Sequence, residues 1–275
     1  MFDRLIHRWL RVPYTLNVRS YQSPKNPRAT VILLHGIGSS VKMWQRMIES
    51  KIIDQDIRVL AVDLLGFGDS PRPDWKVYDV ATQSKSLTAT LLTQMITGPI
   101  IIVGHSLGAL VATNYAHSSP KSVHSLILCS PPFYRPEGKS RFTERKLRSL
   151  YRKIIASEKI NRLLVTDLAQ KYQLINPGYR VNKSNLSIFL DTLDAAIINQ
   201  NSLQQITDIT APVDLIYGQL DPVVINKNLQ ELVADNDNVT LTCTFSSHEI
   251  DKRYAKLVAE KINQHADLAN NRSQN

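Results

Sequence analysis

The chain has 275 residues, of which 43% are apolar and 21% are charged. This length is near the upper limit for one hydrophobic core, so one domain that carries an insertion is expected rather than two equal domains. The absence of low-complexity tracts excludes a mainly disordered or fibrous protein, and no apolar run approaches the ~20 residues that cross a bilayer. The net charge is +9, and eight basic residues against two acidic ones fall between Arg135 and Lys153.

The start of the chain is basic and amphipathic. Arg4, Arg8 and Arg11 interrupt its apolar residues, so it lacks the continuous apolar segment of a secretory signal, and we expect a cytoplasmic protein. The same stretch, together with the basic cluster, is suited to weak contact with anionic surfaces such as a membrane, and a packed or frayed terminus is the alternative. Cys129 and Cys243 are expected to be reduced core residues, with one disulfide as the alternative.

Short β-branched runs alternate with helical patterns, which indicates crossover units and a mostly parallel, doubly wound α/β sheet. The predicted strands are Thr15–Tyr21, Thr30–Leu34, Arg58–Val62, Ile100–Val103, Ser125–Cys129, Asp214–Tyr217 and Val239–Phe245. The predicted helices between them are Val41–Ser50, Val77–Thr97, Leu107–Ser118, Val224–Ala234 and Glu249–Asn263. Consecutive apolar residues in several strands predict that helices cover both faces of the sheet.

One connection is too long for a single crossover helix. It runs from Ser130 to Pro212, and its helical patterns are Thr143–Ala156, Lys159–Gln173, Lys183–Asn199 and Asn201–Thr207, with a turn at Asn176–Gly178. We therefore predict a helical cap, residues 133–207, inserted into a core of residues 1–132 and 208–265. Residues 266–275 are expected to be a polar, disordered tail.

The segment from Pro99 through the helix at Leu107 contains a strand, a G-x-S-x-G turn and a helix, in that order. This context predicts a sharp turn that presents the Ser106 hydroxyl above the sheet edge, between Gly104 and Gly108. An accidental surface turn is the alternative interpretation, but the flanking strand and helix disfavour it. Ser106 is therefore the candidate nucleophile.

A serine hydroxyl needs a neighbouring base to take its proton. In this strand–turn–helix architecture the acid and then the histidine follow the serine in the chain, which favours His248, on the loop before the last helix. Asp221, shortly after a strand, is the candidate acid, and Asp214 is a weaker competitor because it opens a strand. The alternatives are a capping histidine and a turn aspartate. The segment after Cys129 offers no carboxylate before Glu137.

Backbone donors for an oxyanion are also predicted. The glycines of His35–Gly38 follow a buried strand, and the amides of Ile37 and Leu107 form the natural pair, the latter at a helix N-terminus. A plain glycine turn is the alternative interpretation.

These residues together resemble the α/β-hydrolase family. The resemblance covers His35-Gly36, Asp63–Ser70, Gly104–Gly108, Asp221 and His248, and Ser247 replaces the glycine that the family usually has before its histidine. It implies a serine hydrolase that cleaves an ester, thioester or related acyl bond, with a structural rather than catalytic role for Asp63–Ser70. Acyl transfer, perhydrolysis or carbon–carbon bond hydrolysis at the same residues, and a non-catalytic ligand-binding protein, are the alternatives.

We expect a small acyl substrate, no metal or other cofactor, and no sequence-specific nucleic acid, because no ligand-spaced cluster or nucleic-acid-binding motif accompanies the basic segment. Aromatic residues of the cap line an acyl pocket or form helix–helix core; they are Phe133, Tyr134, Phe142, Tyr151, Tyr172, Tyr179 and Phe189. The basic segment itself reads as a solvated helix face or a surface that attracts anions.

Overall fold

The computed structural model describes residues 5–156 and 185–273 of the chain. Its sheet has seven strands in the order β1-β3-β2-β4-β5-β6-β7. The strands are β1 (Val18–Gln22), β2 (Ala29–Leu34), β3 (Ile57–Val62), β4 (Ile100–His105), β5 (Ser125–Cys129), β6 (Val213–Gly218) and β7 (Val239–Thr244). Only β1 pairs antiparallel with its neighbour; the remaining pairs are parallel, which confirms the predicted fold class.

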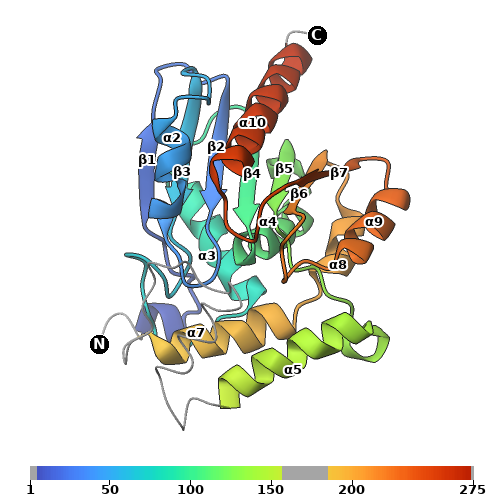
Figure 1. The fold of residues 1–275 in the computed structure, drawn as a ribbon. Helices are drawn as coiled ribbons and strands as arrows, with labels where there is room; N and C mark the ends of the chain where they lie inside the picture. Colours follow the sequence, from blue (N-terminus) through green and yellow to red (C-terminus); the bar gives the residue numbers. More distant parts are fainter. Residues whose placement is uncertain (1–4, 157–184, 274–275) are drawn as a thin grey trace.

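Helices cover both faces of this sheet (Figure 1). They are α2 (Gln45–Glu49), α3 (Val80–Leu92), α4 (Leu107–Ser118), α9 (Asn226–Ala234) and α10 (Lys252–Ser273), with a 3-10 turn, η2 (Val41–Trp44), before α2. Alternate strand residues point to opposite faces, so β2 contributes Ile32 to one apolar cluster and Val31 to the other. This double coverage explains why β2, β5 and β6 are buried along their whole length.

Between β5 and β6 the described part of the insertion is helical, as predicted. It contains η4 (Glu137–Lys139), α5 (Phe142–Ala156), α7 (Leu186–Thr192), η6 (Leu193–Ile198), α8 (Ser202–Gln205) and η7 (Ile206–Asp208). In Figure 1, α5 and α7 lie across one end of the sheet. The predicted helix Lys159–Gln173 and turn Asn176–Gly178 lie outside the described residues.

Two expectations from the sequence are wrong, one for the last ten residues and one for Cys243. Helix α10 continues to Ser273, so most of the segment expected as a disordered tail is helical. The extension is stable because Ala266 and Ala269 are buried and His265, also buried, bonds to Asp214. Cys243 is exposed rather than in the core, and both cysteines are free thiols.

Within the described ranges, no helix combines the length and the apolar character that a membrane span requires.

Candidate active site

Ser106 stands at the turn from β4 into α4. Its backbone has φ 52° and ψ −114°, a conformation that non-glycine residues rarely adopt. The Ser106 amide donates a 2.9 Å hydrogen bond to the Cys129 carbonyl oxygen, at the end of the neighbouring strand β5. The turn therefore fixes the serine at the edge of the sheet, and only 5% of the residue is exposed.

Glycine is required where backbones approach closely around this turn. A Cβ on Gly104 would lie 2.4 Å from the carbonyl oxygen of Gly108, so β4 and α4 could not pack as they do. A Cβ on Gly218, the last residue of β6, would lie 2.3 Å from the Ser247 carbonyl oxygen. Gly218 thus lets β6 approach the loop that carries His248. The residue before this histidine is Ser247, and its carbonyl oxygen makes the close approach.

His248 and Asp221 meet beside this turn. The Nδ1 atom of His248 lies 2.8 Å from Oδ2 of Asp221, and both side chains are nearly inaccessible to solvent. The other carboxylate oxygen of Asp221 accepts bonds from the amides of Val223 (2.8 Å) and Val224 (3.3 Å). Asp221 is therefore held by the turn after β6 while it orients the imidazole.

The surroundings of Asp221 favour its ionised form. Burial raises the pKa of this carboxyl, whereas the adjacent His248 lowers it by charge and by hydrogen bonding. The Val223 amide and the Ser130 hydroxyl lower it further, so the pKa lies below its ordinary value. Ser130, fully buried with φ 49°, also lies 3.3 Å from the Tyr254 hydroxyl. Sequence reasoning passed over Ser130, although it occupies the strand end where a carboxylate was sought.

His105 is the last residue of β4 and directly precedes Ser106. In the structure its Nε2 lies 2.8 Å from the carbonyl oxygen of His248 and the two rings are 4.9 Å apart. Burial and, second, the neighbouring His248 lower the pKa of His105 to about 3, so its imidazole is neutral at physiological pH. Because a carbonyl only accepts, Nε2 carries the proton, and His105 fixes the backbone of the His248 loop.

The loop after β2 is oriented by another neutral histidine. The Leu64 amide donates to Nε2 of His35 (2.9 Å), so Nδ1 carries the proton that is given to the Gly36 carbonyl (2.7 Å). Burial is the main cause of the lowered pKa of His35. The bond from Leu64 fastens the loop that contains Ile37 to the segment that follows β3, and the bond to Gly36 fixes the ring within its own loop.

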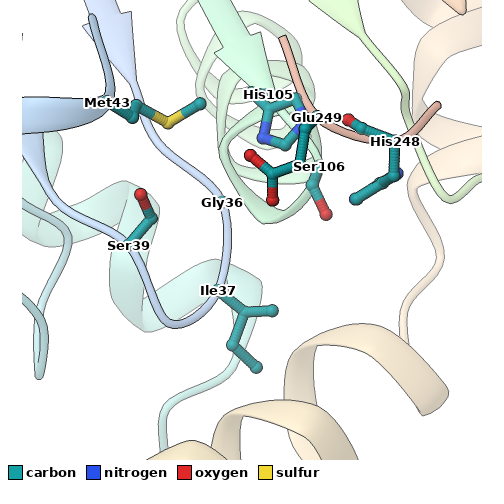
Figure 2. A pocket seen from close by; sticks show the side chains of 8 residues that line it. All are labelled: Gly36, Ile37, Ser39, Met43, His105, Ser106, His248 and Glu249. Carbon is teal, nitrogen blue, oxygen red and sulfur yellow. Dashed lines mark hydrogen bonds between the residues drawn. The ribbon is translucent and has the colours of Figure 1, made fainter. Parts of the chain in front are cut away.

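Two small cavities flank Ser106 and His248. The first comprises about 240 Å³ of space that is partly open to solvent, and Figure 2 shows the residues around it. Besides Ser106 and His248, it is lined by Gly36, Ile37, Ser39, Met43, His105 and Glu249. The second, about 250 Å³, lies on the side of the cap and shares Ile37 with the first. Its other lining residues are Pro132, Tyr151, Leu193, Ile197 and Val223, so it is mainly apolar.

The other sequence-predicted candidates differ in their distance from this site. Asp214 lies at the opposite end of β6 from Asp221 and bonds to His265 and Lys261. Of the cap aromatics, Tyr151 lines the second cavity, Phe133, Tyr134 and Phe189 are buried, and Phe142 is exposed. Tyr172 and Tyr179 lie outside the described residues. No three His, Cys, Asp or Glu residues of the described segments are grouped to hold a metal ion.

The basic segment is more than a solvated face. Arg135 and Arg141 both pair with Glu231 of α9, and the buried Arg148 donates to the Arg135 carbonyl oxygen. These partners come from a distant helix and from the backbone. A count of charges along the sequence does not reveal them.

The fold and this strand–serine–helix turn define an α/β hydrolase. The family model described as "Serine aminopeptidase, S33" matches residues 25–247, and the chain belongs to this family.

The chain is similar to named relatives in sequence and to solved structures in fold. The chain is 28% identical over 244 residues to a pimeloyl-[acyl-carrier protein] methyl ester esterase of Pseudoalteromonas atlantica, covering 82% of this chain and 89% of the relative. It is 31% identical over 127 residues to the probable lysophospholipase BODYGUARD 2 of Arabidopsis thaliana, covering 45% of this chain but only 27% of that protein. The esterase EaEST from Exiguobacterium antarcticum shares its fold with a TM-score of 0.71 at 17% identity, covering 92% of this chain and 95% of that one.

Proposed function

We propose that this protein is a serine hydrolase that cleaves a carboxylic ester or a related acyl bond through Ser106, His248 and Asp221. The observation that carries the proposal is one arrangement: Ser106, in a strained turn, lines the same two cavities as His248, whose ring is bonded to Asp221. Activities named for similar proteins, among them an ester esterase and a probable lysophospholipase, support the same reaction class.

The hydrogen bond to Asp221 supports the role proposed for the histidine. An ionised carboxylate only accepts, so Nδ1 of His248 carries a proton, and in the proposed mechanism Nε2 takes the proton of Ser106. The serine oxygen then attacks the acyl carbon and forms a tetrahedral oxyanion. Collapse of this species, with the proton passed to the leaving group, gives an acyl-enzyme, which water attacks with His248 again as the base.

Two backbone amides are proposed to stabilise the oxyanion. Leu107 is the first residue of α4, so its amide has no acceptor within the helix and lies at the positive end of the helix dipole. Ile37 lines both cavities next to Ser106 and supplies the second donor. Each such donor is worth ~3 kcal/mol of transition-state stabilisation in serine hydrolases.

The mainly apolar cavity on the cap side is proposed to receive the acyl group, and the cavity that contains Ser39 and Glu249 the leaving group. The large side chains of Tyr151, Leu193 and Ile197 leave little space on the cap side of Ser106, so we expect a preference for short acyl chains. Kinetics on p-nitrophenyl esters from acetate to decanoate test this assignment. Ile197→Ala, which enlarges the cap-side cavity, should shift the preferred acyl group to longer chains.

Met43→Ala is the matched control, because Met43 lines only the other cavity. It should leave the acyl-length preference unchanged. An equal shift in both variants, or none in Ile197→Ala, would contradict the assignment of the two cavities.

The serine mechanism is tested by replacing the nucleophile. Ser106→Ala should lower the turnover of a short p-nitrophenyl ester at least about 1,000-fold, while circular dichroism shows an unchanged fold. Turnover that persists in the purified variant would exclude the mechanism. Product analysis with added alcohol or peroxide separates hydrolysis from acyl transfer and perhydrolysis.

A further inference from the structure

The first described residues form a small, closed turn with an apolar outer surface. The helical turn η1 (Leu5–Trp9) is closed by bonds from the Leu10 amide to the Leu5 carbonyl (3.1 Å) and from the Val12 amide to the Ile6 carbonyl (3.2 Å). Trp9 is 77% exposed, Leu10 67% and Leu5 50%. Large apolar side chains gathered in this way usually mark a surface that meets another apolar phase.

This turn is anchored to the body of the protein. The ring of His7 stacks on Tyr14, with 3.7 Å between ring centres and an angle of 17° between the planes. Nδ1 of His7 also lies 2.9 Å from the Val12 carbonyl oxygen, and Tyr14 is buried in the core. The apolar side chains of Trp9 and Leu10 therefore project from a fixed base rather than from a loose end.

Positive charge lies within the same turn as the apolar surface. Arg8 and Arg11 are exposed within the same turn. At the same end of the molecule lies α5 (Figure 1), which exposes Lys146 and Lys153. A tryptophan and leucines bordered by basic residues are the combination that binds the interface of an anionic bilayer.

We propose that residues Leu5–Val12 form an interfacial anchor that inserts Trp9 and Leu10 into the headgroup region of a bilayer containing anionic phospholipids. Arg8 and Arg11 would bind lipid phosphates at the same depth. A second copy of this chain fits the surface less well, because a two-fold contact would bring the arginines of the two copies together. The proposal is independent of the catalytic mechanism, because it requires no turnover.

Sedimentation with vesicles tests the anchor directly. The full chain should bind phosphatidylcholine vesicles that contain phosphatidylglycerol and bind pure phosphatidylcholine vesicles much more weakly. Trp9→Ala combined with Leu10→Ala should weaken binding to the anionic vesicles at least about tenfold, because two large side chains no longer leave water. Arg8→Gln combined with Arg11→Gln should weaken it about 20-fold, with little change on neutral vesicles.

Leu92→Ala combined with Met95→Ala is the matched control. These residues are 81% and 86% exposed but lie at the opposite end of the sheet, where Arg58 at the start of β3 bonds to the Gln94 carbonyl. This variant should bind like the unaltered chain. The proposal fails if the intact chain does not bind anionic vesicles, or if the Trp9/Leu10 variant binds as the control does. A dimer in solution that dissociates in the Trp9/Leu10 variant would also overturn it and assign the surface to a second copy.

Discussion

The backbone conformation of Ser106 is energetically unfavourable, although the proposed mechanism depends on it. A non-glycine residue at φ 52° costs on the order of 1–3 kcal/mol, and the hydrogen bond to Cys129 together with the close packing of Gly104 against α4 holds the turn in place. Ser130, with φ 49°, repeats this conformation at the end of the next strand and contacts Asp221. Both strained residues thus lie within the proposed site.

His105 should act through the position of His248. In His105→Phe the ring volume is retained but the hydrogen bond to the His248 carbonyl is lost. We expect kcat to fall roughly 10- to 100-fold, because a small displacement of the base is costly, while KM changes less than about threefold. Steady-state kinetics on a short ester provides the measurement.

The control for this variant is His117→Phe, at a half-exposed histidine of α4 that pairs with Asp208. It should leave kcat unchanged. A KM effect without a kcat effect in His105→Phe would show that His105 does not position the base.

At the scale of elements, the carboxylate of Glu144 joins the cap to the core. Glu144 is fully buried in α5 and accepts bonds from the amides of Arg135 (2.8 Å) and Arg141 and from Nδ2 of Asn228 in α9 (2.7 Å). Its bond to Arg141 also caps the start of α5. These contacts fix the helix that carries Tyr151 into the second cavity.

Glu144→Ala should therefore lower the free energy of unfolding by about 2–4 kcal/mol, because buried donors are left without an acceptor. Urea denaturation measures the change. Glu137→Ala, which removes an exposed ion pair with Arg152, should leave stability almost unchanged, because solvent screens such a pair. Equal losses in the two variants would refute the role given to Glu144.

The elements themselves were largely predictable, and their tertiary partners were not. Strand β5 and helix α4 have their predicted bounds because apolar runs and the G-x-S-x-G turn are local signals. The length of α10 was missed because the polar His265 is stabilised by Asp214, 51 residues away. The role of His105 depends on a backbone atom 143 residues away, which no local pattern indicates.

For the whole molecule, buried histidines set the response of stability to acid. Burial lowers the pKa of both His35 and His105, the latter to about 3, whereas an unfolded chain takes up these protons near pH 6.5. The unfolded state then binds more protons, so stability falls as the pH drops below about 6.5. For His105 alone the loss reaches about 2 kcal/mol at pH 5.

Urea midpoints between pH 7 and pH 5 test this effect. His105→Phe should lose about 2 kcal/mol less over this range than the unaltered chain, and His117→Phe should match the unaltered chain. A further loss is expected between about pH 4 and pH 2. Burial raises the pKa of Asp214, but hydrogen bonds from His265, Lys261 and Thr240 lower it to about 2, and the stability gained from this depressed pKa disappears as the carboxyl is protonated. An acid-stability profile that is unchanged in His105→Phe would contradict the account.

The two cavities also belong to the scale of the whole molecule, since each combines residues from distant parts of the chain. The sequence allowed the nucleophile, base and acid to be chosen as candidates from motif order. It did not reveal that Ile197 and Tyr151 of the cap share a cavity with Ser106, because that depends on how the cap packs. It also did not reveal that His7 stacks on Tyr14 and so holds the N-terminal segment against the core.

The most direct test of the central claim is intact-protein mass spectrometry after reaction with a fluorophosphonate, followed by peptide mapping. The account predicts one covalent adduct, located on Ser106, absent in Ser106→Ala and formed at least about 100-fold more slowly in His248→Ala. No adduct on the folded protein, or an adduct at another residue, would contradict it.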